Sequence, residues 1–384
     1  MRKSIKTEIE GYVEIQQEIE LLRKNNLGRT SEKGQVSRII DRLHPRSLSL
    51  KVARILQETG STVTLRLVST DGYLPPFQAG QYINLFTEVN GIRTSRPYSI
   101  SSAPHQTGYY DITVRQVADG FVSSHLKSGI KPGTRLEATA PAGQFYHNPL
   151  FHGDDQVFIA GGSGITPFMS MIRETTDRGL DRRMHLIYGC RTENDIVFEA
   201  ELQERSAAFP NFTTSIVISE PAAGYTGPAG FITADRIRSS IGDGQGKMVY
   251  VCGPDAMYQF VLGELEKLEI PKRRIRVEIF GPPGDITTQP GWPESVKKGD
   301  TFTVMFNNTP VQARAGEPLM NSLERSGLVL PAQCRSGECS LCRTRLVSGR
   351  VFQPRGVKLR KSDRTFGYIH PCMAYPLEDL ELKL

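Results

Sequence analysis

The stretch CRSGECSLC, residues 334–342, holds three of the chain's six cysteines, Cys334, Cys339 and Cys342. A fourth, Cys372, follows after 29 further residues. Thiolates are soft ligands that favour zinc, copper(I) and iron–sulfur clusters. Structural zinc sites usually divide four cysteines into two short pairs, whereas three on one tight loop with a remote fourth is the plant-type [2Fe–2S] spacing. The spacing therefore predicts a [2Fe–2S] cluster held by these four residues, with zinc or free thiols as the alternative.

The residues between these cysteines suit an anionic cluster. Gly337 lets the backbone turn tightly, so that amides can point at sulfur. Arg335 and Arg343 flank the ligands and either offset the negative charge of the cluster or face solvent. We therefore expect the loop to supply hydrogen-bond donors as well as ligands.

Outward from this loop, the hydrophobic pattern divides the chain into segments. Residues 299–384 contain short strand-like runs and one helix-like run, which predicts a small α+β domain. Residues 281–298 are rich in Pro and Gly and are interpreted as a linker. Residues 151–280 alternate strands with helices, which predicts an open parallel sheet. Residues 49–150 hold alternating apolar runs between DG, NG and PG turns, which predicts an antiparallel barrel or sandwich.

The first segment, residues 1–48, is interpreted as an N-terminal helical extension. Apolar residues recur at helical spacing from Ile5 to Leu22, and the helix is expected to end near Gly28. A basic connector is expected to follow it. Such a helix either packs on the main body or docks a partner.

Two glycine-containing motifs follow predicted strands of the α/β segment. GGSGITP, residues 161–167, is not the GxGxxG fingerprint, but its glycines permit close approach of a diphosphate to a helix N-terminus. Thr166 is expected to cap that helix, and Pro167 suits its first position. Taken alone, this string fits a plain strand–helix turn equally well. CGPDAMY, residues 252–258, ends a later strand, where open α/β sheets bind ligands.

The barrel segment carries a second pair of motifs. RPYSISS, residues 96–102, is a predicted strand whose alternation places Arg96 and Tyr98 on one face and Ser99 on the other. GFVSSHL, residues 120–126, opens a short predicted helix with a Gly-led turn. Helix N-termini with small hydroxyl residues bind phosphate.

These motifs resemble those of the ferredoxin–NADP reductase superfamily, which carries R-x-Y-S and a later Gly/Ser turn, then G-G-x-G-x-T-P and C-G-P. LPAQCRSGECSLCRTRLVSG followed by HPCMAYP resembles the plant-type ferredoxin domain of many reductases. The order is similar to that of single-chain oxygenase reductases such as the phthalate dioxygenase reductase group, and to the reductase of the hybrid-cluster protein. The resemblance implies a flavin-binding β-barrel, a parallel-sheet nucleotide-binding domain and a β-grasp ferredoxin domain.

The resemblance also implies residue roles. Arg96 would pair with a flavin phosphate, Tyr98 would pack against the isoalloxazine and Ser99 would bond near its N5. Tyr98, Ser99 and Cys252 are the implied catalytic residues. The EIF string, residues 278–280, resembles the superfamily's Glu-x-aromatic close, which would place Glu278 or Phe280 near the flavin. The implied cofactor-binding residues are Arg96, Pro97, Tyr98, Ser99, Gly120, Val122, Ser123, Ser124, Gly161, Gly162, Gly164, Thr166, Cys252, Gly253, Pro254 and Phe280.

The cofactors implied are FAD, with FMN as an alternative, a [2Fe–2S] cluster, and NADH or NADPH. NADPH-using relatives often carry Ser-Arg after the third strand of the nucleotide domain, where this chain has Ser219 and Glu220. A carboxylate repels a 2′-phosphate, which favours NADH, although the nearby Arg191 leaves NADPH open. Cys190, which ends another predicted strand, is interpreted as a small packed residue.

The implied activity is an electron-transfer reductase that passes electrons from NAD(P)H through flavin and cluster to a protein acceptor. An oxygenase or hydroxylase component is the first candidate for that acceptor. A non-oxygenase metalloenzyme is the second, and a non-catalytic electron-relay subunit is the third hypothesis for the chain.

Composition limits the remaining possibilities. A net charge of +6 over 384 residues does not indicate a nucleic-acid partner. No apolar run reaches the ~18 residues that span a membrane, and no secretory signal is visible. Clustered cysteines without an export signal suit a reducing compartment. We therefore expect a cytoplasmic protein with no membrane span.

Overall fold

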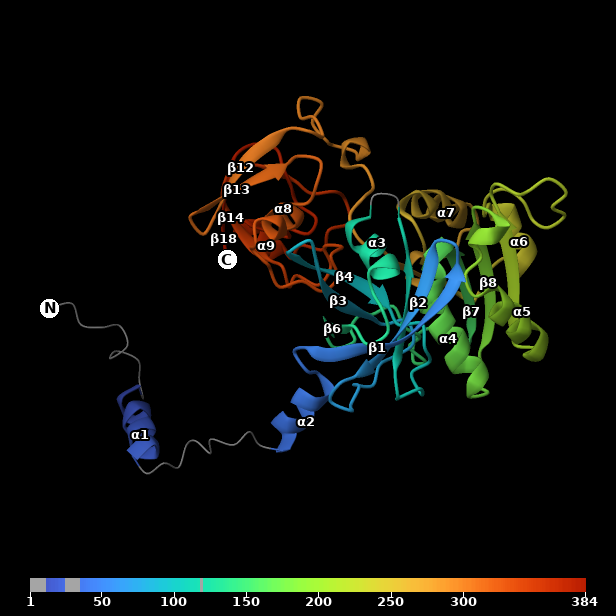
Figure 1. Ribbon diagram of the computed structural model, residues 1–384, viewed down its shortest axis with the longest axis horizontal. Helices are drawn as coiled ribbons and strands as arrows, with labels where there is room; N and C mark the ends of the chain where they lie inside the picture. The colour runs from blue at the N-terminus through green and yellow to red at the C-terminus, as the bar shows by residue number, and fades with distance from the viewer. Residues whose placement is uncertain (1–11, 25–34, 118–119) are drawn as a thin grey trace. The chain divides into compact units, whose positions relative to one another are not determined.

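The computed structural model describes residues 12–24, 35–117 and 120–384 (Figure 1). The chain divides into two compact units, Met1–Pro45 and Arg46–Leu384. In the first unit, α1 spans Tyr12–Lys24 and α2 spans Gln35–Leu43.

The first unit confirms a helical extension and corrects its details. The expected helix is present over its described part, whereas its expected end at Gly28 lies outside the described residues. The expected connector is wrong over α2, because Val36, Ile39 and Ile40 recur at the spacing of one helix face. These three side chains are exposed.

The second unit begins with a six-stranded antiparallel sheet in the order β4-β3-β6-β1-β2-β5. A bridge between Ile100 and Ile112 joins its two edges, so the sheet curls into a barrel. The NG turn predicted at residues 90–91 connects β3 to β4, with positive φ at both residues as such a turn requires. The elements are β1 Leu48–Thr59, β2 Thr62–Ser69, β3 Tyr82–Val89, β4 Ile92–Ser99, β5 Tyr110–Arg115, α3 Phe121–Ser128 and β6 Arg135–Ala138.

A five-stranded parallel sheet follows, in the order β11-β10-β7-β8-β9. One buried cluster joins a face of this sheet to α4 and α5, and another joins the opposite face to α6 and α7, which gives a doubly wound fold. The strands are β7 Asp155–Gly161, β8 Arg183–Cys190, β9 Phe212–Ile218, β10 Met248–Cys252 and β11 Ile275–Glu278. The helices are α4 Ile165–Asp177, α5 Glu199–Ala208, α6 Ala234–Ile241 and α7 Asp255–Lys267, with short 3₁₀ turns at Gly162–Gly164, Glu193–Asp195 and Lys272–Arg274.

The C-terminal part has a mixed sheet in the order β13-β12-β18-β14-β16, in which β12 and β18 are parallel. Helix α8 packs on it through Leu319, Met320 and Leu323. The elements are β12 Thr301–Phe306, β13 Thr309–Arg314, α8 Leu319–Arg325, β14 Thr344–Ser348, β15 Val351–Phe352, α9 Lys361–Thr365, β16 Tyr368–Ile369, β17 Tyr375–Pro376 and β18 Leu380–Lys383.

Residues 281–298, between the parallel-sheet domain and the C-terminal part, contain the 3₁₀ turn Ile286–Thr288. Trp292 in this segment packs against Phe352 and Tyr375 of the C-terminal part, with ring centroids 5.3 and 6.3 Å apart. The segment that the sequence suggested as a linker is therefore fixed to the domain that follows it.

Candidate functional site

A cavity of about 1120 Å³ opens where the strand order of the parallel sheet reverses, between β7 and β10. Ligands of doubly wound sheets bind at this switch point, outside the carboxyl ends of the strands. The cavity also includes residues of the barrel, such as Arg115 and Val117. Of the predicted nucleotide-binding residues, it brings together Gly161, Gly162, Gly164, Cys252, Gly253, Pro254 and Phe280.

The glycines of this cavity allow two loops and an arginine to approach closely. Gly162 has a φ of +52°, and a Cβ at this position would lie 2.6 Å from Arg115 Nη1. A Cβ on Gly164 would collide with the carbonyl of Cys252. Close packing of the strand–helix turn against Arg115 and Cys252 therefore requires these glycines, and the approach of a diphosphate stays a prediction.

The expectation that Thr166 caps the helix is wrong. Helix α4 begins at Ile165 with Gly164 as its N-cap, because a 3₁₀ turn carries the chain from the strand into the helix. Thr166 is buried, lies outside the cavity and donates its hydroxyl to Ser163 O at 2.7 Å. Pro167 lies further along the first turn, where a backbone N–H has no intrahelical partner to lose.

Cys252 contributes a neutral thiol to this site. Its side chain is 1% exposed, and burial raises the pKa of Cys252 well above its usual value, with the nearby Glu278 carboxyl adding to the effect. Tyr258 donates its hydroxyl to Glu278 O, which fixes the loop after β10 to the end of β11. Cys190 is packed in the buried core, as the sequence predicted, and it also lines the cavity.

The cavity rim carries charged residues that sequence reasoning located only in part. Arg191 lies between two carboxylates, with its Nε 3.8 Å from Asp195 and 4.0 Å from Glu220. Asp195 also pairs with Arg115 at 3.1 Å. Asp195 gave no sequence signal, because its position depends on the 3₁₀ turn after β8.

The strand β4 presents the predicted flavin residues with the expected alternation. Arg96 and Tyr98 are half-buried, whereas Pro97 and Ser99 are buried. Arg96 Nη1 donates to Thr94 Oγ1 at 2.9 Å and to Ser95 O at 2.7 Å. Burial, followed by the neighbouring Arg335 charge, lowers the pKa of Arg96 to about 10.

The turn before α3 is also shaped by close contacts. Gly120 is the N-cap of α3, and a Cβ there would collide with Ser123 Oγ. Ser123 Oγ accepts from Val117 N at 3.2 Å, and Ser124 Oγ accepts from Gln116 Nε2 at 3.2 Å. Val122 packs in the barrel core, so only its backbone can serve a ligand.

Phe280 connects the cavity to the barrel. It lines the cavity and packs edge-on against Tyr82 of β3, with ring centroids 6.1 Å apart. Burial, and then the Cys334 and Cys339 thiols, raise the pKa of Tyr82, which places this ring within electrostatic reach of the cysteine loop.

The four predicted cluster cysteines lie as two pairs. Cys342 Sγ and Cys372 Sγ are 3.4 Å apart, and Cys334 interacts with Cys339. Among the described residues, no three such side chains converge as for a single metal ion. Two pairs of thiols are what a two-iron cluster with two terminal thiolates on each iron requires.

Backbone amides point at the first of these thiols. Ser336 N, Glu338 N and Cys339 N donate to Cys334 Sγ at 3.5, 3.3 and 3.3 Å. Gly337 has a φ of +76°, which allows this turn as the sequence predicted. The Cys339 thiol, and then the amides, lower the pKa of Cys334 against the effect of burial. The donor set therefore fits an anionic [2Fe–2S] cluster.

The two arginines of the cysteine loop have separate partners. Arg335 forms an ion pair with Glu324, and their side chains are 5% and 4% exposed. Arg343 pairs with Asp363 at 3.0 Å. Both are therefore engaged in ion pairs, which the sequence left open.

Three family models match the chain in this order. They describe an oxidoreductase FAD-binding domain over residues 48–147, an oxidoreductase NAD-binding domain over residues 158–262, and a 2Fe-2S iron-sulfur cluster binding domain over residues 304–377. Each matched region contains the corresponding motifs.

Curated relatives resemble most of the chain. The NADPH oxidoreductase of Mycobacterium tuberculosis is 30% identical over 80% of this chain and 77% of its own. The glycine betaine monooxygenase reductase subunit of Chromohalobacter salexigens is 27% identical over 85% and 93%. The NADH oxidoreductase HCR of Escherichia coli is 29% identical over 87% and 96%.

Solved structures share the fold. Phthalate dioxygenase reductase is 24% identical, covers 88% of this chain and 98% of its own, and has a TM-score of 0.65. The FAD/NAD-binding domain of nitric oxide dioxygenase from Vibrio cholerae is 25% identical, covers 61% and 99%, and has a TM-score of 0.56. Within the described residues, no helix has the length and apolar character needed to cross a membrane.

Proposed function

The chain belongs to the ferredoxin–NADP reductase family and carries a C-terminal [2Fe–2S] ferredoxin domain, and we propose that it supplies electrons from NADH to an oxygenase component. It is an oxidoreductase with FAD, NADH and [2Fe–2S] as its cofactors. Several relatives are named as reductase components of monooxygenases, which supports an oxygenase as the acceptor.

One observation carries this proposal. Phe280 lies between the nucleotide cavity and Tyr82, and Tyr82 lies near the Cys334 and Cys339 pair. The Phe280–Tyr82 contact therefore leads from the nucleotide cavity into the barrel, where Tyr82 is within electrostatic reach of the cysteine loop. The flavin, when bound, converts a two-electron donor into single-electron steps, and the task of the protein is to position the three groups.

We assign the binding roles by position. The half-buried Arg96 carries a charge with only neutral partners of its own, and it suits a flavin phosphate. The free amides at the start of α3 suit the same group. The Gly162–Gly164 turn and the N-terminal end of α4 suit the diphosphate of the dinucleotide. The neutral Cys252 thiol places no charge in the nucleotide cavity.

We infer NADH rather than NADPH from the rim of the cavity. Glu220 and Asp195 stand on either side of Arg191 and offset its charge. A carboxylate accepts a hydrogen bond from a ribose 2′-hydroxyl but repels a 2′-phosphate. We also place the activity in the cytoplasm, because no disulfide joins any of the six cysteines, four of which we assign to the cluster, and this suits a reducing compartment.

Anaerobic titration of the purified holoprotein with NADH tests the proposal. We expect bleaching of the flavin band and an electron paramagnetic resonance signal from the reduced cluster. The Cys342→Ser variant removes one ligand, so it should lose the cluster signal and keep NADH-driven ferricyanide reduction. A wild-type flavin that NADH does not bleach would overturn the proposal.

A further inference from the structure

The ferredoxin domain carries its excess positive charge on one segment, residues 353–366, which we call the basic strap. The strap contains five Lys and Arg residues against one Asp, whereas residues 299–384 as a whole contain twelve against eight. The rest of the domain is therefore neutral. All five cations are exposed: Arg355, Lys358, Arg360, Lys361 and Arg364.

The strap is fastened directly to the cysteine loop. Lys358 N donates to Gly337 O at 3.0 Å, and Lys358 Nζ pairs with Glu338 at 2.6 Å. At the other end of the strap, the buried Asp363 accepts from Arg343, the residue after Cys342, at 3.0 Å. These contacts hold the strap next to two of the predicted cluster ligands, Cys339 and Cys342.

The barrel closes one approach to the cysteine loop. Arg335 and Glu324 are buried there, and Glu324 also accepts from Thr94 Oγ1 of the barrel at 2.8 Å. Asn84 of the barrel donates to Ala332 O at 2.7 Å. A partner protein therefore has to approach the cluster from a side that the barrel does not cover, and the strap lies on such a side.

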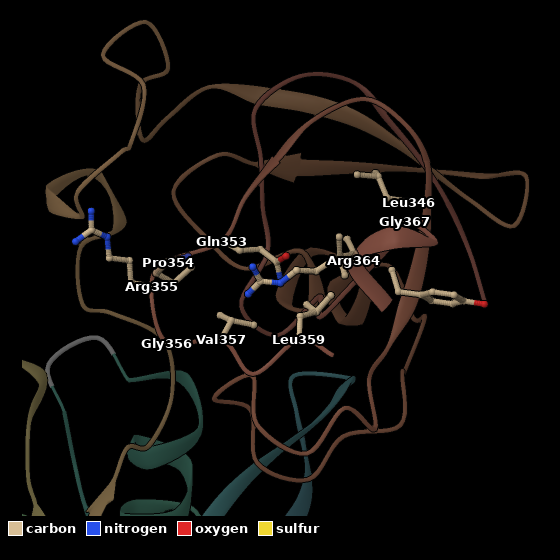
Figure 2. A pocket seen from close by; sticks show the side chains of 11 residues that line it. Leu346, Gln353, Pro354, Arg355, Gly356, Val357, Leu359, Arg364 and Gly367 are labelled. Carbon is tan, nitrogen blue, oxygen red and sulfur yellow. The ribbon is translucent and has the colours of Figure 1, made fainter. Parts of the chain in front are cut away.

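A groove of about 600 Å³ lies between the strap and the strands β14 and β16. Figure 2 shows the Gln353 and Arg364 side chains extending toward each other in this groove, while Arg355 points away. Gln353 Nε2 is buried, and it has no hydrogen-bond partner among the described residues. An amide donor beside a guanidinium fits a carboxylate, and Val357 and Leu359 supply apolar contact.

We propose that the basic strap is the docking surface for an acidic face of the protein electron acceptor, with one of its carboxylates seated in the groove beside Arg364. This inference rests on the proposed function, since it names the chemistry of the acceptor. The exposed Phe366 and Leu341 add apolar contact within a charged rim, as protein interfaces have. Excess surface charge of one sign steers an oppositely charged partner and raises its association rate.

Charge reversal on the strap tests this surface. The variant Arg355→Glu/Arg360→Glu/Lys361→Glu is compared with Arg314→Glu/Arg350→Glu/Lys383→Glu, which reverses three exposed charges elsewhere on the same domain. Reduction of acidic cytochrome b5 and basic cytochrome c by NADH is measured at low salt with the full holoprotein. We expect the strap variant to lose about tenfold or more in kcat/KM for cytochrome b5 and to gain for cytochrome c.

The control variant should change both rates by less than about twofold, and added salt should slow cytochrome b5 reduction by the wild type and the control variant but not by the strap variant. Arg364→Gln should lower the cytochrome b5 rate without raising that of cytochrome c, because it alters the groove more than the net charge. Cluster absorbance per chain reports that each variant is folded.

Two results separate this inference from the proposed function. Unchanged cytochrome b5 reduction by a folded strap variant would refute the docking surface, while NADH-to-ferricyanide turnover still supported the reductase. Unchanged cytochrome b5 reduction together with lost binding to phosphatidylserine vesicles would assign the strap to a membrane surface instead.

Discussion

The barrel contacts its two neighbours by different means. With the nucleotide-binding domain it shares a core, because Ala79 and Phe145 of the barrel segment lie in one buried cluster with Phe158, Phe168 and Tyr250. With the ferredoxin domain it shares polar contacts, from Asn84 to Ala332 and from Thr94 to Glu324. Among the described residues, the ferredoxin core includes none before Val304.

The difference between an apolar and a polar contact suits two different steps, hydride transfer to the flavin and electron transfer to the ferredoxin domain. Hydride transfer needs the nicotinamide and the flavin held in close register, and a shared apolar core fixes the domains that bind them. The ferredoxin domain has its own core and is oriented by a few directional bonds. We therefore expect the barrel and nucleotide domains to unfold as one unit and the ferredoxin domain as another.

The largest expected effect tests the shared core. Phe145→Ala removes a ring that packs on Phe168 at 5.7 Å and on Tyr250 at 5.5 Å. It should lower the free energy of unfolding of the joined unit by about 3–5 kcal/mol. Urea denaturation followed by flavin fluorescence and by cluster absorbance measures the two units separately.

The matched control is Phe306→Ala, which removes a ring from the ferredoxin core instead. It should shift the cluster transition and leave the flavin transition in place. Coincident shifts of both transitions in either variant would show that the three domains form a single cooperative unit.

The buried ion pair gives the next largest effect. Glu324→Gln leaves Arg335 charged and unpaired at 5% exposure, which should destabilise the ferredoxin contact by about 3 kcal/mol. The variant should reduce ferricyanide at the wild-type rate but reduce its cluster more slowly, as stopped-flow absorbance measures. The double variant Glu324→Leu/Arg335→Met should regain stability, because it removes both charges. If neither variant altered the rate of cluster reduction, the Glu324–Arg335 ion pair would have no role in positioning the ferredoxin domain.

The sequence predicted what depends on local pattern. Strand alternation located Arg96 and Tyr98, the NG turn located the β3–β4 hairpin, and cysteine spacing identified the four cysteines that the fold brings together as two pairs. It did not reveal the Glu324–Arg335 pair, because those residues meet only when α8 folds against the cysteine loop.

Two further features escaped prediction for related reasons. Helix α2 was hidden by its basic, Ser-containing sequence, whose apolar residues fit one helix face but are few. Asp195 reaches the cavity rim through a 3₁₀ turn, which has no sequence signature of its own. Contacts between distant segments and irregular turns depend on the folded arrangement rather than on local periodicity.

A smaller effect concerns acid stability beside the shared core. His152 Nδ1 lies 2.6 Å from Tyr250 Oη, and Arg276 Nη2 lies 3.2 Å from its Nε2. Burial, then the charges of Arg276 and His147, lower the pKa of His152 from 6.5 to about 4. Between pH 6.5 and about 4, His152 is therefore protonated in the unfolded chain but neutral in the folded chain. The free energy of unfolding consequently falls as the pH falls from 6.5 towards 4.

The linked loss should reach about 1–2 kcal/mol at a pH near 5. His152→Gln should flatten this part of the stability profile, as urea denaturation across pH measures. His105→Gln, at a more exposed histidine beside Asp177, is the control and should keep the wild-type slope. A slope that survives His152→Gln would assign the acid sensitivity to other groups.

The smallest expected effect comes from a substitution at the rim of the nucleotide cavity, away from the contacts that the barrel makes with its two neighbouring domains. It tests whether the choice of coenzyme is independent of those contacts. Glu220 lies at the cavity rim and is 69% exposed, so Glu220→Arg removes no buried contact. The change replaces a carboxylate that repels a 2′-phosphate with a guanidinium that binds one. It should raise the ratio of kcat/KM for NADPH to kcat/KM for NADH by about tenfold, or about 1.4 kcal/mol of differential transition-state binding.

The control Glu204→Arg, at an exposed position on α5 outside the cavity, makes the same charge change and should leave the ratio unaltered. Equal shifts in both variants would mean that overall charge, rather than a contact at the rim, selects the coenzyme.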